Sequence, residues 1–221
     1  MSKLMTSVSG VRGIFGETLN PIVALQYASH FGQFIAQESA NPASHHIPKI
    51  VVGRDSRTTG KAMLYAILSG LISTGCEVID LGIVPTPTVL LNVKKHSAQG
   101  GISITASHNP PQWNAMKFVD GDGMFLSPEK ASRFIESVNA EISWNDWQNM
   151  GTVTEDAEAI NYHIQRILAI PYLNIAQIRS KKFKVVLDSV NGAGGLASPL
   201  LLKALGCEVV EINSEPTGVF A

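Results

Sequence analysis

The stretch KIVVGRDSRTTGKAMLYAILSGLISTGCEVID, residues 49–80, contains a complete strand–helix–strand unit. It opens with an apolar run at residues 49–53, which is typical of a buried strand. Apolar residues then recur at helical spacing over residues 60–74, and a second strand is expected at residues 76–80. This order predicts two parallel neighbouring strands joined by a crossover helix.

Elements of the same alternating kind lie on both sides of this unit. A helix is expected over residues 21–37, with Asn20 as its N-cap and proline at its first position. A short helix is expected after the breaker at residues 85–87, and a further strand at residues 101–105. Together these patterns predict an α/β fold.

The next segment predicts an antiparallel element and then a boundary. Residues 115–119 and 124–126 are expected to form a hairpin around the turn at residues 120–123, followed by a helix from Ser127 to about Glu141. Residues 144–154 are polar and lack a period. We therefore expect one domain over residues 1–150 and a second that begins at residue 151.

The remaining residues repeat the order of strand, glycine turn, helix and strand. A helix is expected at residues 157–170, a strand at 183–188, a helix at 198–205 and a strand at 207–212. Residues 215–221 then form a loop, so this α/β unit lacks the further strands that it needs. We therefore expect a truncated chain or fragment whose second domain, residues 151–221, is incomplete.

Composition excludes several classes of protein. The 221 residues carry a formal net charge of −1 and no long run of Lys or Arg, which argues against a nucleic-acid binder and favours a small polar or anionic ligand. The two cysteines predict no disulfide framework. No apolar run has the length of a signal peptide core or a membrane span, which predicts a cytoplasmic protein with no membrane partner.

The side chains best suited to catalysis cluster at residues 105–110, Thr-Ala-Ser-His-Asn-Pro, directly after a predicted strand. The hydroxyl of Ser107 is a weak nucleophile unless a neighbour takes its proton or it carries a phosphoryl group. His108 is adjacent, but neighbouring side chains on an extended backbone point in opposite directions, and no ordered acid suggests a triad. A polar turn closed by Asn109 and Pro110 is the plain alternative.

This string, followed by Trp-Asn-Ala-Met-Lys at residues 113–117, resembles the phosphoserine loop of the α-D-phosphohexomutase family. Further stretches agree with the family in order and spacing: Ser-Gly-Val-Arg-Gly at residues 9–13, Gly-Arg-Asp-Ser-Arg at 53–57 and Asp-Ser-Val-Asn-Gly-Ala-Gly at 188–194. The resemblance spans essentially the whole chain. It implies a three-layer mixed sheet with helices on both faces as domain 1, and a truncated second α/β domain.

The resemblance also implies a reaction. Ser107 would be the phosphorylated serine of an intramolecular phosphotransferase that interconverts hexose 6-phosphate and 1-phosphate through a bisphosphorylated sugar. One oxygen of its phosphate would ligate Mg²⁺. The other metal ligands and the loop that selects the sugar are expected beyond Ala221, so the chain alone should not turn over.

Four further site residues follow from the resemblance. Lys117 matches a lysine proposed to transfer a proton at the sugar hydroxyl, with an ordinary surface lysine as the alternative. Arg12, between two glycines, would bind the phosphate beside Ser107 with a fork of hydrogen bonds. His108 would support the reaction near the sugar hydroxyl, and Asn109 would contact phosphate.

Two other patterns have structural interpretations. Arg54 is a less secure candidate for the site, because Arg54, Asp55 and Arg57 could simply form a local salt-bridged turn that holds the domain together. The Asp-Gly-Asp-Gly string at residues 120–123 resembles the start of the family's metal loop, but it comes too soon after the serine loop. We interpret it as the hairpin turn.

The sugar of the substrate is predicted by comparison with members of the family. Trp113, together with the Ser-Val-Ser-Gly-Val-Arg-Gly string at residues 7–13, resembles bacterial phosphoglucosamine mutases. Phosphomannomutase or phosphoglucomutase activity is the alternative, so the substrate is a glucosamine, mannose or glucose phosphate. The one protein partner left open is a second copy of the chain, in a homodimer. Outside the family, a serine hydrolase using Ser107 and His108, or a non-catalytic phosphosugar-binding module, stays open.

Overall fold

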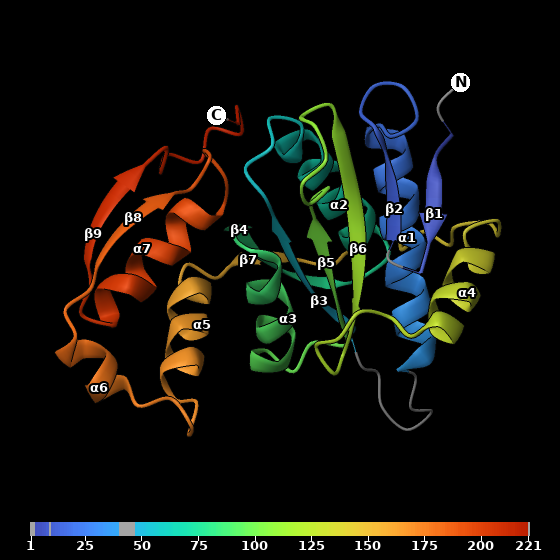
Figure 1. The fold of residues 1–221 in the computed structure, drawn as a ribbon. Helices are drawn as coiled ribbons and strands as arrows, with labels where there is room; N and C mark the ends of the chain where they lie inside the picture. The colour runs from blue at the N-terminus through green and yellow to red at the C-terminus, as the bar shows by residue number, and fades with distance from the viewer. Residues whose placement is uncertain (1–2, 9, 40–46, 221) are drawn as a thin grey trace.

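The computed structural model describes residues 3–8, 10–39 and 47–220. In these residues one mixed sheet has the strand order β1-β2-β6-β5-β3-β4-β7 (Figure 1). Its members are β1 (Met5–Ser7), β2 (Gly10–Ile14), β3 (Lys49–Arg54), β4 (Glu77–Ile83), β5 (Gly100–Ile104), β6 (Trp113–Asp120) and β7 (Val153–Glu155). The pairs from β5 through β3 and β4 to β7 are parallel, whereas β1, β2 and β6 pair antiparallel.

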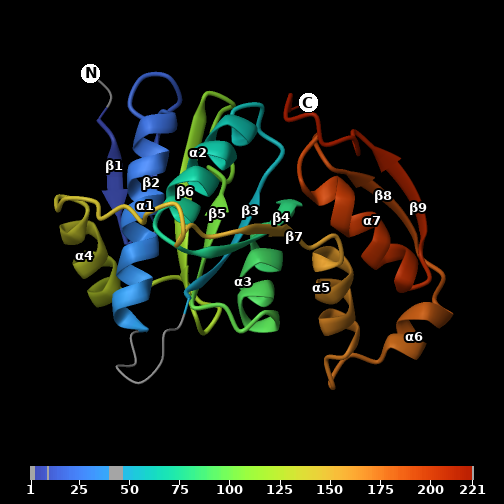
Figure 2. The ribbon, with the colours of Figure 1, turned by 180° about the vertical axis from the view of Figure 1, so that it is seen from behind.

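Helices cover both faces of this sheet, which confirms the predicted three-layer fold (Figures 1 and 2). On one face α1 (Pro21–Glu38), α2 (Gly60–Ser73) and α4 (Pro128–Ser137) bury a common core in which Phe31, Phe118 and Phe134 pack ring against ring. On the other face α3 (Thr86–Lys95) packs Val89 and Val93 against the sheet. These two apolar layers fix the position of the sheet, one end of which carries the candidate site.

Several element limits differ from the sequence prediction for local reasons. The helix predicted after residues 85–87 begins at Thr86, because proline is tolerated in the first turn, where its missing N–H has no partner to lose. The hairpin turn is confirmed by the bond from the Asp120 N–H to the Met124 carbonyl. Its return arm, however, makes only an isolated bridge between Val119 and Phe125. The strands β1, β2 and β7 were not predicted.

A second unit, residues 159–220, follows the first sheet. It contains α5 (Ala159–Leu168), α6 (Ile175–Ser180), β8 (Lys184–Asp188), α7 (Gly194–Ala204) and β9 (Glu208–Ile212). Strands β8 and β9 pair in parallel as a two-stranded sheet within the described residues. Val186, Val210 and Ile212 remain 63%, 40% and 43% exposed. This sheet therefore keeps apolar side chains in contact with solvent.

Within the described residues the two units contact each other through a helix pair and through a loop. Helix α5 of the second unit lies against α3 of the first, and on its other side against α7 of its own unit (Figure 1). Near the predicted serine loop, the hydroxyl of Ser56 donates to the carbonyl oxygen of Asn191 at 2.9 Å. Strand β7 belongs to the first sheet although it follows residue 150. No helix within the described residues is long and apolar enough to cross a membrane.

Candidate active site

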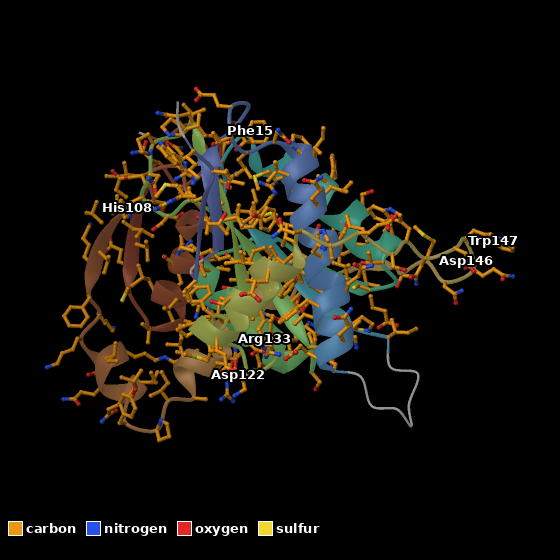
Figure 3. The ribbon with its side chains drawn as sticks, turned by 90° about the vertical axis from the view of Figure 1, so that its right-hand side faces the viewer. Phe15, His108, Asp122, Arg133, Asp146 and Trp147 are labelled. Carbon is orange, nitrogen blue, oxygen red and sulfur yellow. The ribbon has the colours of Figure 1, made fainter. Side chains whose placement is uncertain are left out.

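The predicted serine loop connects β5 to β6 at one end of the sheet. Because β3 and β5 are parallel, the residues that follow both strands meet there: the Asp55 N–H donates to the Ile104 carbonyl oxygen at 2.9 Å. Figure 3 shows His108 and Phe15 at this end and Asp122 at the opposite end. The loop therefore lies where parallel strands commonly present ligand-binding residues.

Ser107 has a left-handed backbone conformation with a φ of 58°. Non-glycine residues rarely adopt this region, because the Cβ approaches the following carbonyl group. The Thr105 hydroxyl stabilises the turn by accepting a hydrogen bond from the Ser107 N–H at 3.0 Å. Thr105 is buried and Ser107 is exposed. The fold thus anchors the loop from inside and presents the serine hydroxyl to solvent.

His108 contacts this hydroxyl, contrary to the expectation from side-chain alternation. The Ser107 Oγ and the His108 Nδ1 lie 3.3 Å apart. The expectation assumed an extended backbone, whereas a positive φ at Ser107 turns the two neighbouring side chains toward the same side. No carboxylate is bonded to His108 within the described residues, so the pair lacks the acid of a hydrolase triad.

Arg12 reaches the serine loop from the neighbouring strand. It lies in β2 opposite Ala115 of β6, and its Nη1 donates to the Asn109 Oδ1 at 3.1 Å. This bond joins a fixed positive charge to the residue two positions after Ser107. The structure therefore brings together Arg12, Ser107, His108 and Asn109, four of the five predicted site residues. Ser9, which opens the motif of Arg12, lies outside the described residues.

Lys117 lies further along β6, opposite Ser103 of β5. Because side chains alternate along a strand, Lys117 projects from the same face as Ala115 and its cross-strand partner Arg12. Its ammonium nitrogen lies 5.8 Å from the centroid of the Phe125 ring. Lys117 thus lies on the same face of the sheet as Arg12 but beside the hairpin, without a direct contact to Ser107.

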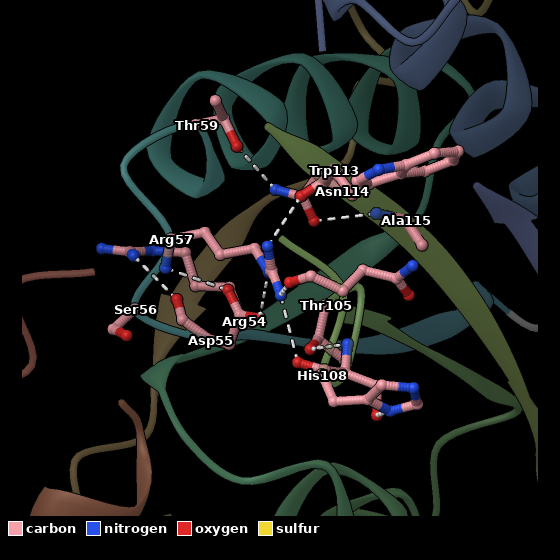
Figure 4. Close-up of polar contacts among 12 residues, drawn as sticks. Arg54, Asp55, Ser56, Arg57, Thr59, Thr105, His108, Trp113, Asn114 and Ala115 are labelled. Atoms are coloured by element: carbon pink, nitrogen blue, oxygen red, sulfur yellow. Dashed lines mark hydrogen bonds and ion pairs between the residues drawn. The ribbon is translucent and has the colours of Figure 1, made fainter. Parts of the chain in front are cut away.

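Arg57 makes hydrogen bonds at this site that the sequence did not predict. The predicted salt bridge to Asp55 is present, at 3.1 Å between Nε and Oδ2. The guanidinium group also donates to carbonyl oxygens of the serine loop, which lies 50 or more residues away in sequence (Figure 4). The one available signal was topological, because Arg57 follows β3 and the loop follows its parallel neighbour β5.

The described residues offer Mg²⁺ only part of a binding site. They contain no group of three or more His, Cys, Asp or Glu side chains placed to hold a metal ion. Mg²⁺ prefers six oxygen ligands in octahedral geometry, and the exposed Ser107 would supply one through its phosphate. Asp120 and Asp122 are engaged in the distant hairpin, bonded to the Lys130 ammonium at 2.7 Å and the Met124 N–H at 2.8 Å respectively. The interpretation of residues 120–123 as a turn is therefore confirmed.

Comparison with known proteins decides the family. The model of the phosphoglucomutase/phosphomannomutase α/β/α domain I matches residues 3–144, and that of domain II matches residues 161–221. The chain belongs to the phosphoglucomutase/phosphomannomutase family. The resemblance drawn from the sequence motifs is thereby confirmed.

Individual members of the family are similar over nearly the whole chain. A probable phosphoglucosamine mutase of Methanopyrus kandleri is 35% identical over 96% of this chain, and a phosphoglucomutase/phosphomannomutase of Thermococcus kodakarensis is 37% identical over 96%. The crystal structure of a putative phosphomannomutase from Thermus thermophilus matches with a TM-score of 0.82 at 25% identity over 100% of this chain. The chain covers 44%, 45% and 48% of these proteins respectively, about half of each family member.

Proposed function

We propose that the full-length protein is a phosphosugar mutase in which Ser107 carries the phosphoryl group. The observation that carries this proposal is the serine itself: it is exposed, held in a left-handed turn at the end of β5, and two positions before Asn109, which is bonded to Arg12. A phosphoserine adds up to two negative charges, which a nearby guanidinium stabilises through charge-assisted hydrogen bonds. Family membership supports the same reaction class.

The proposed reaction transfers the phosphoryl group twice. A hydroxyl oxygen of the hexose monophosphate attacks the phosphorus on Ser107, the bond from phosphorus to the serine oxygen breaks, and the hydroxyl proton passes to a base. The resulting bisphosphorylated sugar then returns its other phosphoryl group to Ser107. Positioning and charge stabilisation provide most of the catalysis in such transfers.

We propose a role for each of the other site residues from its position in the site. Arg12 binds phosphate oxygens, and Asn109, held by Arg12, orients the loop and contacts phosphate. His108 contacts the serine oxygen at 3.3 Å and exchanges a proton near the reacting hydroxyl. Lys117 acts in proton transfer at the sugar, which requires its ammonium to leave Phe125 when substrate binds. Each role is a proposal of ours.

Mg²⁺ is proposed as the metal of the full-length protein. When bound, it neutralises charge on the phosphoryl oxygens. The phosphate on Ser107 would supply one ligand, and the others are proposed to lie beyond residue 221.

Glucosamine phosphate is the proposed substrate. Methanopyrus kandleri supplies a relative named a probable phosphoglucosamine mutase. Mannose or glucose phosphate is the alternative, supported by the Thermococcus kodakarensis relative named phosphoglucomutase/phosphomannomutase. Assaying the full-length protein with glucosamine, mannose and glucose 6-phosphates in parallel tests this choice, and a clear preference for either of the last two would overturn it.

The carrier role is tested by intact-mass spectrometry of the full-length protein incubated with Mg²⁺ and a hexose 1,6-bisphosphate. One added phosphoryl group is expected, located at Ser107 by peptide mapping and missing from Ser107→Ala. An unmodified wild-type protein would refute the proposal. Labelling of Ser107 by a fluorophosphonate probe, without phosphoryl uptake, would favour the serine hydrolase.

We propose that the two family domains meet between residue 150, the limit expected from the sequence, and Glu155, where β7 of the first sheet ends. A homodimer and a cytoplasmic location are proposed on the same terms, as is the inactivity of the 221 residues on their own.

A further inference from the structure

Arg57 is buried beneath the serine loop and uses every donor that it has. Its side chain is 1% exposed. Nη2 donates to the carbonyl oxygens of Ser107 at 3.1 Å and Asn109 at 2.7 Å, and Nη1 to those of Pro110 at 2.8 Å and Trp113 at 3.0 Å. With Nε bonded to Asp55, all five N–H groups of the guanidinium have an acceptor.

This arrangement supplies hydrogen-bond donors for carbonyl groups that the loop cannot pair by itself. A loop that turns sharply cannot pair its carbonyl groups in a ladder, and buried carbonyl groups without a donor are unfavourable. One planar fork pairs four of them at once. The carbonyl groups belong to Ser107 itself and to three residues that follow it, so the guanidinium group fixes the chain from the serine to Trp113 (Figure 4).

The carboxylate of Asp55 compensates the buried positive charge of Arg57. Its Oδ2 accepts from the Arg57 Nε, and its Oδ1 accepts from the Arg57 N–H at 3.0 Å. A buried charge requires a partner and full hydrogen bonding, and Arg57 has both. The carboxylate therefore orients the guanidinium toward the loop.

We propose that Arg57 is a positioning residue of the phosphoryl transfer: it sets the place and direction of the Ser107 oxygen without touching the substrate. The proposal rests on the proposed function, since it concerns the same serine. Ser107 keeps its left-handed conformation because its carbonyl is held by Arg57 and its N–H by Thr105. Release of the carbonyl lets the serine relax toward an ordinary conformation, which moves its hydroxyl.

The same side chain meets the second unit. The Phe220 ring lies 5.0 Å from the guanidinium carbon, and the preceding residue Ser56 bonds to Asn191. Arg57 therefore lies between the serine loop and the last described residues of the second unit. A displaced Arg57 side chain would therefore disturb both the serine loop and the last described residues of the second unit.

The test compares Arg57→Met with Arg57→Lys in the full-length protein. Methionine approximates the length without any donor, whereas lysine keeps a charge that can serve some of the four carbonyl groups. Arg133→Met is the matched control, because Arg133 is a half-exposed arginine that pairs with Glu38 far from the loop. Each protein is phosphorylated with a hexose 1,6-bisphosphate at a temperature well below its midpoint of unfolding, and the rate is followed by intact mass.

We expect Arg57→Met to slow phosphorylation of Ser107 by about 100-fold, the order of loss that a misplacement of about 1 Å produces. Arg57→Lys should recover part of the rate, and Arg133→Met should match wild type. The reduction in steady-state kcat should exceed any change in KM. Hydrogen exchange should speed up at the amides of residues 105–113 in Arg57→Met.

Two results overturn the proposal. One is a folded Arg57→Met or Arg57→Lys that is phosphorylated at the wild-type rate. The other is slowed phosphorylation with unchanged exchange in the loop and an equal loss in Arg133→Met, which would indicate a general loss of stability. If wild type itself takes up no phosphoryl group, the proposed function fails; the loop exchange of Arg57→Met still tests whether Arg57 holds the loop.

Discussion

The conformation of Ser107 stores strain in the residue proposed to react. A non-glycine residue in the left-handed region is disfavoured by roughly 1–2 kcal/mol, and Ser107 has a φ of 58°. We therefore predict that Ser107→Gly is more stable than Ser107→Ala by about 1 kcal/mol, because both remove the hydroxyl but only glycine relieves the strain. Urea unfolding of both variants measures the difference.

Neither variant should take up a phosphoryl group, which separates chemistry from stability at this position. An alanine variant as stable as the glycine variant would mean that residue 107 relaxes to a negative φ in solution. Such a result would also weaken the role given to Arg57, since the bond to the Ser107 carbonyl is what holds the turn.

At the scale of the elements, the N-cap of α1 offers a direct measurement. The Asn20 Oδ1 accepts a hydrogen bond from the Val23 N–H at 3.0 Å, and the helix then begins with Pro21. Asn20→Ala should lower the free energy of unfolding by about 1 kcal/mol. Asn20→Asp retains the acceptor and is the control. Equal losses in both variants would contradict the assignment of the cap.

The contact between α3 and α5 should make stability depend on pH. His163 of α5 contacts the Thr88 hydroxyl of α3 at 2.8 Å, and burial lowers the pKa of His163. The unfolded chain, with a histidine pKa of about 6.5, then binds this proton more readily than the folded chain does. Stability is therefore fully present above about pH 6.5 and is lost as the pH falls below it, by at most about 1.4 kcal/mol per pH unit for one group.

The prediction is checked by urea unfolding at pH 7.5, 6.5 and 5.5. His163→Gln should show a shallower loss of stability with falling pH than wild type. Some dependence should remain, because burial also lowers the pKa of His30 in α1. Identical slopes for His163→Gln and wild type would show that His163 does not contribute.

The elements that could be predicted from sequence are those with strong local signals. The strand β3 and the helix α1 are marked by an apolar run and by an N-cap followed by proline. Strands β2 and β7 carry no such signal, since β2 includes two glycines and β7 has three exposed residues. Their structure depends on pairing with β6 and β4, which are distant in sequence.

At the scale of the whole molecule, Gly218 of the second unit packs against the turn that follows β3 in the first unit. It has a φ of 74°, and a Cβ there would lie 2.0 Å from the Ser56 carbonyl oxygen. Gly218→Ala should therefore displace the 215–220 segment and destabilise the chain by more than the backbone strain alone, roughly 1–2 kcal/mol. Hydrogen exchange at residues 55–57 should increase.

Gly82→Ala is a matched control for this prediction. Gly82 also has a positive φ, of 66°, but a Cβ there would meet no atom within 4 Å. The difference between the two variants isolates the contact between the units. If Gly82→Ala destabilises as much as Gly218→Ala, the segment does not rest on Ser56 in solution.

The candidate site was predictable to the extent that its residues share a motif. Ser107, His108 and Asn109 are consecutive, and Arg12 was found through a family motif near the start of the chain. The clamp by Arg57 could not be predicted, because its acceptors are backbone carbonyl groups, which any sequence possesses. The contact of His108 with Ser107 depends likewise on one backbone angle that the residue types do not specify.

The exposed valines and isoleucine of the small β8–β9 sheet have a consequence for handling the protein. Both strands have one edge without a strand partner in the described structure, and unpaired edges with apolar side chains are templates for aggregation. We expect the 221 residues to self-associate as their concentration rises, measured by light scattering. Val186→Lys and Val210→Lys should suppress self-association by placing a charge on the exposed apolar face of the β8–β9 sheet, whereas Val153→Lys, in the first sheet, should not.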